Sequence, residues 1–371
     1  MNTRCIVSYT PTKRTLRRPI ATLAVLLAFG WAADAGESPR ATVGAYYFDG
    51  WAGKNAHAGK ADWAKDAPTH LTKRMLDEFP DREPVWGWRD DKLETMERQI
   101  DLAADHGIAF FAICWYFRPT QKQVDEDPLH TGLNLFLKAK NNHRLKFCLL
   151  VANHQGAFIG SPENWTRAAE YWMPYLTHKQ HVKVDGKPLV IIFNPRDSSK
   201  EGLDNLQTAA RKAGLSGLAM AACGGGDPKM GYSHRTYYNI VPGYDAGSQE
   251  HRYAELVEAH QKAWSGTPQQ PFIPEVTTGW DKRPWEGERG LSQKPGWYFP
   301  DRTPEAFGKF LQSSIDWMDK NPDRTTKERI VLVYAWNEFG EGGYLAPTKG
   351  DPEGKYLRAL KEVILPMAAK R

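Results

Sequence analysis

The 371-residue sequence predicts an α/β fold, a single (β/α)8 barrel of the TIM type that follows an N-terminal signal peptide. Three observations support this fold class. Short apolar, β-rich runs recur eight times, segments with helical spacing separate most of them, and no low-complexity linker divides residues 36–371. Alternating strands and helices pair in parallel, because each helix carries the chain back across the sheet. Eight such units close a barrel, for which about 250 residues suffice.

The strands are assigned to runs that are mostly continuous in apolar residues, as expected when both faces of a parallel sheet are covered. The run GIAFFAICWYF at 107–117 shows this pattern most clearly. The eight expected strands are 41–48, 107–117, 144–153, 188–194, 217–223, 238–244, 272–278 and 329–336.

The helices are assigned to segments in which apolar residues recur at helical spacing. The competing fold is a doubly wound nucleotide-binding sheet. The segment GAYYFDGWAG at 44–53 argues against it, because aromatic side chains stand where a pyrophosphate needs bare backbone. The seven expected helices are 92–106, 129–142, 163–177, 202–213, 250–265, 303–320 and 352–368.

The first 35 residues have the order of a secretory signal peptide. Basic residues up to Arg18 precede an apolar run at 20–29, and the triplet ADA at 33–35 supplies small residues for cleavage. We predict cleavage after Ala35 and a secreted or periplasmic protein. Arg17 and Arg18 also form a twin-arginine pair, which keeps that export route open as the less favoured one.

The charge of the chain is concentrated in this leader. Residues 1–35 carry five basic side chains and one acid, which account for +4 of the formal net charge of +5. Residues 36–371 are nearly neutral, so there is no electrostatic reason to expect a nucleic acid or an anionic membrane as a partner. No later run reaches about 18 uninterrupted apolar residues, and we expect no membrane association after cleavage.

The cysteines give no indication of a metal site. Cys114, Cys148 and Cys223 lie in apolar runs rather than at metal-ligand spacing. We expect buried free thiols, with a Cys114–Cys148 bridge as the lesser alternative, and we expect no metal or other cofactor.

Aromatic and polar side chains gather where the expected strands end, which is the face where barrel enzymes place their chemistry. Aromatic rings stack on the apolar face of a sugar, while carboxylates and amides bind its hydroxyl groups. Any one of these aromatic residues is more often a packing residue, so only their clustering favours a carbohydrate site. The candidate substrate-binding residues are Tyr46, Tyr47, Trp115, Tyr116, His154, Tyr244, Trp280, Asp281, Trp336 and Asn337.

The last expected strand leads directly into the segment NEFGEGG at 337–343. Glu338 and Glu341 are three residues apart on this turn and can face one cleft, and its three glycines permit unusual backbone angles. Glycosidic cleavage uses two carboxyl groups, one to protonate the leaving oxygen and one as base or nucleophile. An exposed acidic loop is the weaker alternative, because a buried strand precedes the turn. Glu338 and Glu341 are therefore the candidate catalytic residues.

The segment WNEFGEGGYLAP at 336–347 resembles the motif W-N-E-W-x-E-G-x-x-[IL]-E-P of glycoside hydrolase family 99 and its WbsX-like relatives. The shorter motifs YY at 46–47, CWY at 114–116 and GWD at 279–281 are similar to motifs of the same family. The resemblance therefore extends over most of residues 36–371.

This resemblance implies a retaining, endo-acting α-glycosidase that uses no metal. In that family the first glutamate of the motif is a base toward the substrate's own 2-hydroxyl group, and the second is the general acid and base. Carried over, these roles fall to Glu338 and Glu341. Phe339 replaces the usual tryptophan, which conserves packing. Ala346 replaces the usual acid, which removes a potential substrate contact and leaves the family's mannoside specificity open.

The favoured function is a secreted glycoside hydrolase that cleaves an α-glycosidic bond of a polysaccharide or glycan, with an α-mannosidic bond as one candidate. A sugar transferase of the WbsX-like type is the second hypothesis. Export weakens it, because nucleotide-sugar donors are cytosolic and no phosphate-binding motif is present. A non-catalytic carbohydrate-binding barrel is the third. The sugar, the linkage and the oligomeric state stay open, since the subsites depend on the loops 49–91 and 279–300.

Overall fold

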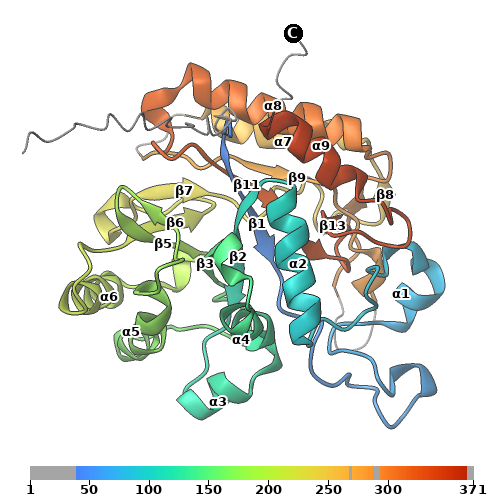
Figure 1. Ribbon diagram of the computed structural model, residues 1–371, viewed down its shortest axis with the longest axis horizontal. Helices are drawn as coiled ribbons and strands as arrows, with labels where there is room; N and C mark the ends of the chain where they lie inside the picture. Colours follow the sequence, from blue (N-terminus) through green and yellow to red (C-terminus); the bar gives the residue numbers. More distant parts are fainter. Residues whose placement is uncertain (1–38, 267–269, 288–292, 366–371) are drawn as a thin grey trace, which may run out of the picture. The chain divides into compact units, whose positions relative to one another are not determined.

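The computed structural model describes residues 39–266, 270–287 and 293–365, and the predicted signal peptide at 1–35 lies outside them. Eight parallel strands form a barrel within these residues (Figure 1). In their order around the sheet they are β7 (His234–Thr236), β6 (Ala219–Cys223), β5 (Lys187–Ile192), β3 (Lys146–Val151), β2 (Ile108–Trp115), β1 (Thr42–Tyr47), β11 (Ile330–Tyr334) and β9 (Glu275–Thr277).

The barrel closes between β7 and β9, where the strand pairing is reduced to a bridge between Arg235 and Phe272. The backbone N–H of Arg235 donates to the carbonyl of Pro271 at 3.0 Å, and its own carbonyl accepts from Ile273 at 2.8 Å. The sheet is thus nearly closed, because the last strand meets the segment that leads into β9. The predicted fold class, a TIM-like barrel, is confirmed.

The sixth predicted strand is wrong. Residues 238–244 form a loop, and the strand at this position is the three-residue β7, which precedes them. Its sequence, His-Arg-Thr, has no apolar run to mark it. The strand forms because of its pairing partners. β7 pairs with β6 in parallel, and the hydroxyl group of Thr236 donates to Ile273 O at 3.0 Å. Tertiary pairing overrides the local propensity here. Each of the other predicted strands overlaps an observed one.

Each of the seven predicted helices overlaps an observed one, and the helices pack outside the strands (Figure 1). Local signals begin some of them, since Ser161 caps α5, Ser199 caps α6 and Thr303 caps α8. These seven are α2 (Leu93–Asp105), α4 (Thr131–Lys138), α5 (Pro162–Leu176), α6 (Lys200–Lys212), α7 (Tyr253–Ser265), α8 (Pro304–Lys320) and α9 (Lys355–Ile364). Residues 366–368 of the last predicted helix lie outside the described residues. The short helices α1 (Lys73–Glu78) and α3 (Gln121–Glu126) lie in loops.

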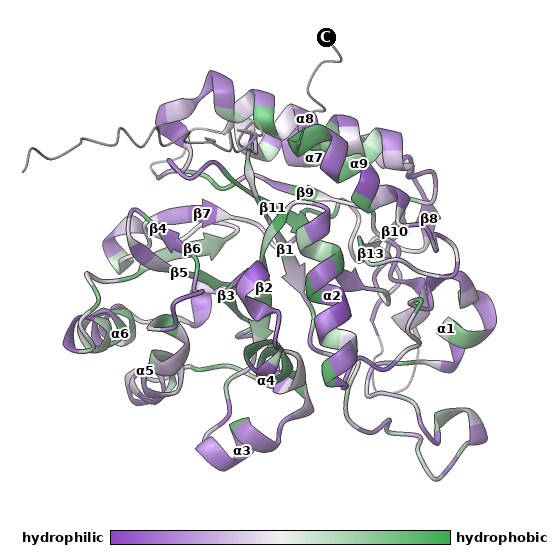
Figure 2. Cartoon of the chain, viewed as in Figure 1, coloured by the Kyte–Doolittle hydropathy of each residue, from purple (hydrophilic) through white to green (hydrophobic). Residues whose placement is uncertain are grey.

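The core is arranged in the layers that this architecture requires. Figure 2 shows hydrophobic residues along β3, β5 and β6, whereas β7 is hydrophilic and α2 carries residues of both kinds. On α6 the buried residues Leu203, Leu206 and Ala210 recur at helical spacing, so one face of that helix packs inward. Within the described residues, no helix has both the length and the apolarity that crossing a bilayer requires.

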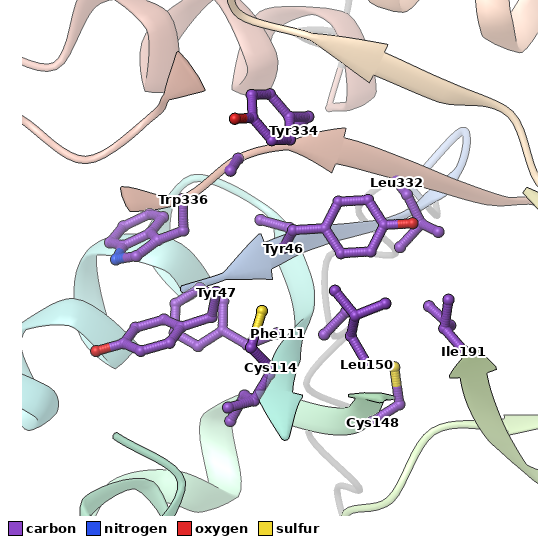
Figure 3. Close-up of a cluster of buried hydrophobic side chains, with 14 of the residues drawn as sticks. Tyr46, Tyr47, Phe111, Cys114, Cys148, Leu150, Ile191, Leu332, Tyr334 and Trp336 are labelled. Carbon is purple, nitrogen blue, oxygen red and sulfur yellow. The ribbon is translucent and has the colours of Figure 1, made fainter. Parts of the chain in front are cut away.

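The barrel interior is filled by side chains from several strands, among them Tyr46, Leu150 and Leu332 (Figure 3). The predicted free thiols are confirmed, because Cys114, Cys148 and Cys223 are each buried and unbridged. Tyr47, Phe111 and Trp336 instead pack together, with ring centroids 5.3 and 5.1 Å apart. Neighbouring residues of one strand therefore serve different layers, because successive side chains point to opposite faces.

Candidate active site

A cavity of about 800 Å³ opens at the carboxyl ends of the barrel strands. The residues that line it follow several different strands, which is the usual construction of a site on this fold. They include Tyr116 after β2, His154 after β3, Phe193 after β5, Tyr238 after β7, and Glu338 and Glu341 after β11.

The two glutamates stand on a hairpin that directly follows β11. The strands β12 (Asn337–Glu338) and β13 (Gly343–Tyr344) pair in antiparallel fashion, and residues 339–342 connect them. The backbone N–H of Asp281 donates to the carbonyl of Glu341 at 2.7 Å, which ties the hairpin to the loop after β9. Glu338 and Glu341, the two predicted catalytic residues, are thus brought together in the wall of one cavity.

The glycines of the hairpin serve two different purposes. Gly342 has a φ of +78°, which a residue with a Cβ rarely adopts. Gly340 is required by close packing, since a Cβ there would lie 2.0 Å from the indole of Trp285. Gly343 is similar, because its Cβ would lie 2.2 Å from the ring of Tyr334. The hairpin can therefore approach its aromatic neighbours only with glycine at these positions.

Each glutamate accepts a hydrogen bond from a buried tyrosine. The hydroxyl group of Tyr238 donates to Oε1 of Glu338, and that of Tyr334 donates to Oε2 of Glu341. The two tyrosine rings meet edge to face at 5.0 Å. The second oxygen of Glu338, Oε2, is buried and has no hydrogen-bond partner within the described part of the chain. An acceptor in the cavity wall is therefore left for a ligand.

The surroundings of Glu338 and Glu341 raise the pKa values of both carboxyl groups. Burial raises the pKa of Glu338 well above its ordinary value and the Glu341 carboxylate raises it further, whereas the Tyr238 hydroxyl lowers it. Burial likewise raises the pKa of Glu341, while hydrogen bonds from Tyr334 and Gln293 and the charge of Lys282 lower it. Two carboxyl groups whose charges interact titrate as a pair, in two separate steps. Such a pair can supply an acid and a base at the same pH.

Three of the predicted substrate-binding residues line the cavity: Tyr116, His154 and Tyr244. The backbone N–H of Tyr116 donates to Nε2 of His130 at 3.1 Å, which fixes the start of this loop. The ring of Tyr244 covers the ammonium group of Lys282 at 3.8 Å, which holds the phenol at the cavity wall.

The other seven predicted substrate-binding residues are described, but they do not line this cavity. Some are held by hydrogen bonds elsewhere: the Tyr46 hydroxyl donates to Tyr237 O at 2.7 Å, and the Tyr47 hydroxyl donates to Asp90 Oδ2 at 3.0 Å. The indole N–H of Trp336 donates to Gln99 Oε1 at 2.7 Å. The seven are Tyr46, Tyr47, Trp115, Trp280, Asp281, Trp336 and Asn337.

The remaining four of these seven support the site from behind. Asn337 binds both the N–H and the carbonyl of Phe48 at 2.8 Å, so it joins the hairpin of Glu338 and Glu341 to the end of β1. Trp115 stacks on the ring of His130 at 5.4 Å. Trp280 packs against the cavity-lining Tyr244 at 5.6 Å, and the carboxylate of Asp281 is paired with two arginines.

The sequence departure at Ala346 also lies behind the wall. Ala346, a described residue, is buried, does not line the cavity, and donates its backbone N–H to Trp336 O at 2.9 Å. The replacement of the motif's acid by Ala346 therefore changes the packing under the hairpin rather than the lining of the cavity. Phe339 contacts the rings of Trp51 and Tyr344 at 5.3 and 5.5 Å, so its change is one of packing, as expected.

Sequence reasoning missed several residues of the site. Tyr238 was expected inside a strand, although the pair Tyr237-Tyr238 repeats the pair YY at 46–47, which ends the first strand. Tyr334 was assigned to the last strand without a role. Other cavity residues come from loops that no periodicity places, namely His70 from 49–91 and Trp285 and Gln293 from 279–300.

The described residues contain no group of three or more histidine, cysteine, aspartate or glutamate side chains that could hold a metal ion.

A parallel barrel with an aromatic-walled cavity and two glutamates at the strand ends defines a carbohydrate-active TIM-like barrel. The family model of glycosyltransferase WbsX matches residues 88–360, and the chain belongs to this family. The resemblance inferred from the motif at 336–347 is thus confirmed.

Solved structures of glycoside hydrolases share the fold. A structure described as a glycoside hydrolase-like protein is similar over 89% of this chain and 95% of its own, with a TM-score of 0.57 and 13% identity. The family 99 endo-α-mannosidase from Bacteroides thetaiotaomicron is similar over 87% of this chain and 96% of its own, with a TM-score of 0.56 and 14% identity. At such identities the likeness concerns the fold. A comparison with curated protein sequences finds no significant match.

Proposed function

We propose that this protein is an exported glycoside hydrolase that cleaves an α-glycosidic bond of a polysaccharide or glycan with retention of configuration. One observation carries the proposal: Glu338 and Glu341 line the same cavity from one hairpin, each with a tyrosine donor, and Glu338 keeps a free acceptor oxygen. The similarity to an endo-α-mannosidase makes an α-mannosidic bond the first candidate.

The proposed reaction has two steps. Glu338 Oε2 removes the proton from the 2-hydroxyl group of the substrate, whose oxygen attacks the anomeric carbon and forms a 1,2-anhydro sugar. Glu341 protonates the leaving oxygen in the same step. Glu341 then removes a proton from water, which opens the anhydro ring at the anomeric carbon, and the 2-oxygen recovers a proton from Glu338. Two inversions give net retention.

Burial raises the pKa of both carboxyl groups, which favours a protonated group beside an ionised one, the combination that this reaction requires. The assignment of base to Glu338 and of acid to Glu341 follows the motif at 336–347. The Tyr238 hydroxyl opposes the rise at Glu338, which favours the ionised form that a base requires.

A reducing-end assay on α-mannan, α-glucan and acidic glycans tests the proposal, with Glu341→Gln as the matched inactive control. We expect release by the wild-type protein alone, and NMR should show that the first product anomer has the configuration of the substrate. Release only with a nucleotide-sugar donor would favour the transferase that the family description names. Glycan binding without release would favour a non-catalytic barrel.

Export is tested separately. Expression of the full chain in a bacterium with an intact secretion system should give a protein whose N-terminal residue is Gly36. A cytosolic protein that keeps residues 1–35 would contradict the signal-peptide prediction.

A further inference from the structure

A second, smaller cavity adjoins the catalytic hairpin at Gly342 and has a volume of about 200 Å³. All of the residues that line it are described. Its charged residues are Arg82, Arg283, Arg302 and Asp281, and aromatic residues complete the wall. Three guanidinium groups thus face one carboxylate, which leaves the lining with a net charge of +2.

The one carboxylate of this cavity is already saturated. Asp281 Oδ2 accepts from Nη2 of Arg82 at 2.5 Å, and both of its oxygens accept from Arg283, at 2.8 and 2.9 Å. The side chains of Arg82 and Asp281 are only 10% and 11% exposed, so water compensates little of their charge. Asp281 therefore has no hydrogen-bonding capacity to spare for a third guanidinium.

Arg302 is the group left without a counter-charge. It forms no ion pair with any carboxylate of the described residues. One of its five N–H groups, on Nη1, donates to Thr278 O at 3.2 Å. Its guanidinium lies over the rings of Tyr344 and Tyr356, at 4.4 and 5.1 Å. These rings offset part of the cost of holding a cation there, but they accept no hydrogen bonds in its plane.

The position of Arg302 is fixed by packing. A Cβ at Gly279 would lie 2.4 Å from its Cδ, so the stem of the side chain lies directly on the backbone of the loop after β9. The cavity is therefore a preformed cluster of forked donors with unpaired N–H groups, and a ligand would not need to reorganise it.

We propose that this cavity binds a doubly charged oxyanion, a sulfate or phosphate group, either free or as a substituent of a glycan. Sulfate and phosphate oxygens match the guanidinium fork, and two negative charges balance the excess of two positive charges. This site is distinct from the catalytic cavity and does not depend on the proposed hydrolysis.

The cavity is linked to the catalytic hairpin through its own residues. Nη1 of Arg82 donates to Phe339 O at 3.1 Å, and the backbone N–H of Asp281 donates to Glu341 O at 2.7 Å. An anion bound beside Arg82 would therefore lie one hydrogen bond away from the segment that carries Glu338 and Glu341.

The experiment measures sulfate binding by the full chain, by calorimetry and thermal shift, at constant ionic strength with sodium chloride as the balance. We expect saturable binding in the millimolar range and a rise in Tm that saturates with it. Arg302→Met keeps the packed stem and removes the charge, and it should weaken binding at least tenfold. Arg167→Met, on the exposed face of α5, removes one charge elsewhere and should bind sulfate as the wild type does.

A sulfated monosaccharide and its unsulfated parent distinguish the two sources of the anion. Binding of inorganic sulfate shows that the free anion suffices, and binding of the sulfated sugar alone assigns the site to a glycan substituent. Equal binding by Arg302→Met would overturn the proposal. Absence of saturable binding of either sulfated ligand to the wild-type protein would also overturn it, however the variants fold.

Discussion

Two pairs of carboxyl groups lie at neighbouring strand ends of this barrel, and they differ in access rather than in charge. Glu338 and Glu341 follow β11, whereas Asp49 and Asp90 lie in the segment after β1. Burial raises the pKa in all four, and for Asp90 to about 7. Each pair also has a tyrosine donor, which for Asp90 is Tyr47.

The aspartate pair is closed off by backbone. Asp49 Oδ2 accepts from the N–H groups of Gly132 and Leu133, at 2.6 and 3.2 Å, at the start of α4. Neither aspartate lines the large cavity, although both belong to the described residues. A perturbed pKa therefore indicates burial, and a catalytic pair must in addition meet a space that a substrate can enter.

The largest expected effect is the loss of activity in the glutamate pair. Glu338→Gln and Glu341→Gln should each lower kcat/KM on a natural glycan by about 10³-fold, because each removes a proton transfer. A substrate with a good leaving group needs no acid, so it should restore much of the activity of Glu341→Gln in steady-state kinetics. Asp90→Asn, the matched change in the closed pair, should stay within about threefold of wild type. A comparable loss in Asp90→Asn would show that the aspartate pair also takes part in the reaction.

The next effect concerns stability. The pKa of Asp90 is about 7 in the folded state and 3.8 ordinarily, so its contribution to stability is full below pH 4 and is lost as the pH rises through 7. Asp90→Asn has no such titration. Relative to wild type it should gain unfolding free energy on the order of a few kcal/mol between pH 4 and 8.

Urea unfolding at pH 4, 6 and 8 measures this difference. Asp323→Asn, at an exposed position, is the control and should follow the wild-type pH dependence. Parallel curves for Asp90→Asn and wild type would show that Asp90 is ionised in the folded protein.

A smaller effect is expected at the tyrosine donors. The Tyr238 hydroxyl lowers the pKa of Glu338, so Tyr238→Phe should raise that pKa. Because a base must be ionised, the acidic limb of the pH profile of kcat/KM should move to higher pH, with about a tenfold loss near neutral pH. Tyr47→Phe is the control in the closed pair. An unshifted profile in Tyr238→Phe would remove Glu338 from the role of base.

The smallest effect is expected at Trp336, which adjoins the hairpin but packs beneath it. Trp336→Phe loses the hydrogen bond to Gln99 and should cost about 1 kcal/mol of unfolding free energy. Its kcat/KM should stay within about twofold of wild type. A tenfold rise in KM would instead show that the indole contacts substrate.

The sequence predicts correctly those features that depend on residues close together in the chain. The strand GIAFFAICWYF is apolar enough to be recognised, and β2 lies within it. Glu338 and Glu341 were found because a single hairpin holds both. Tyr238 was missed because β7 is only three residues long and depends on pairing with β6. The sequence also did not predict that the Tyr46 side chain is buried away from the cavity. The alternation along a strand separates its two faces, but it does not show which residues a loop will cover.

The order of apolar runs along this chain was sufficient for seven of the eight barrel strands, the helices and the glutamate pair, because each depends on residues close together in the sequence. Folding alone separated the open carboxyl pair from the closed one and gathered Arg82, Arg283 and Arg302 around one cavity. The three arginines alone come from positions up to about 220 residues apart (302 − 82). Their electrostatics depends on which atoms water can reach, and that is settled only when the loops pack against one another.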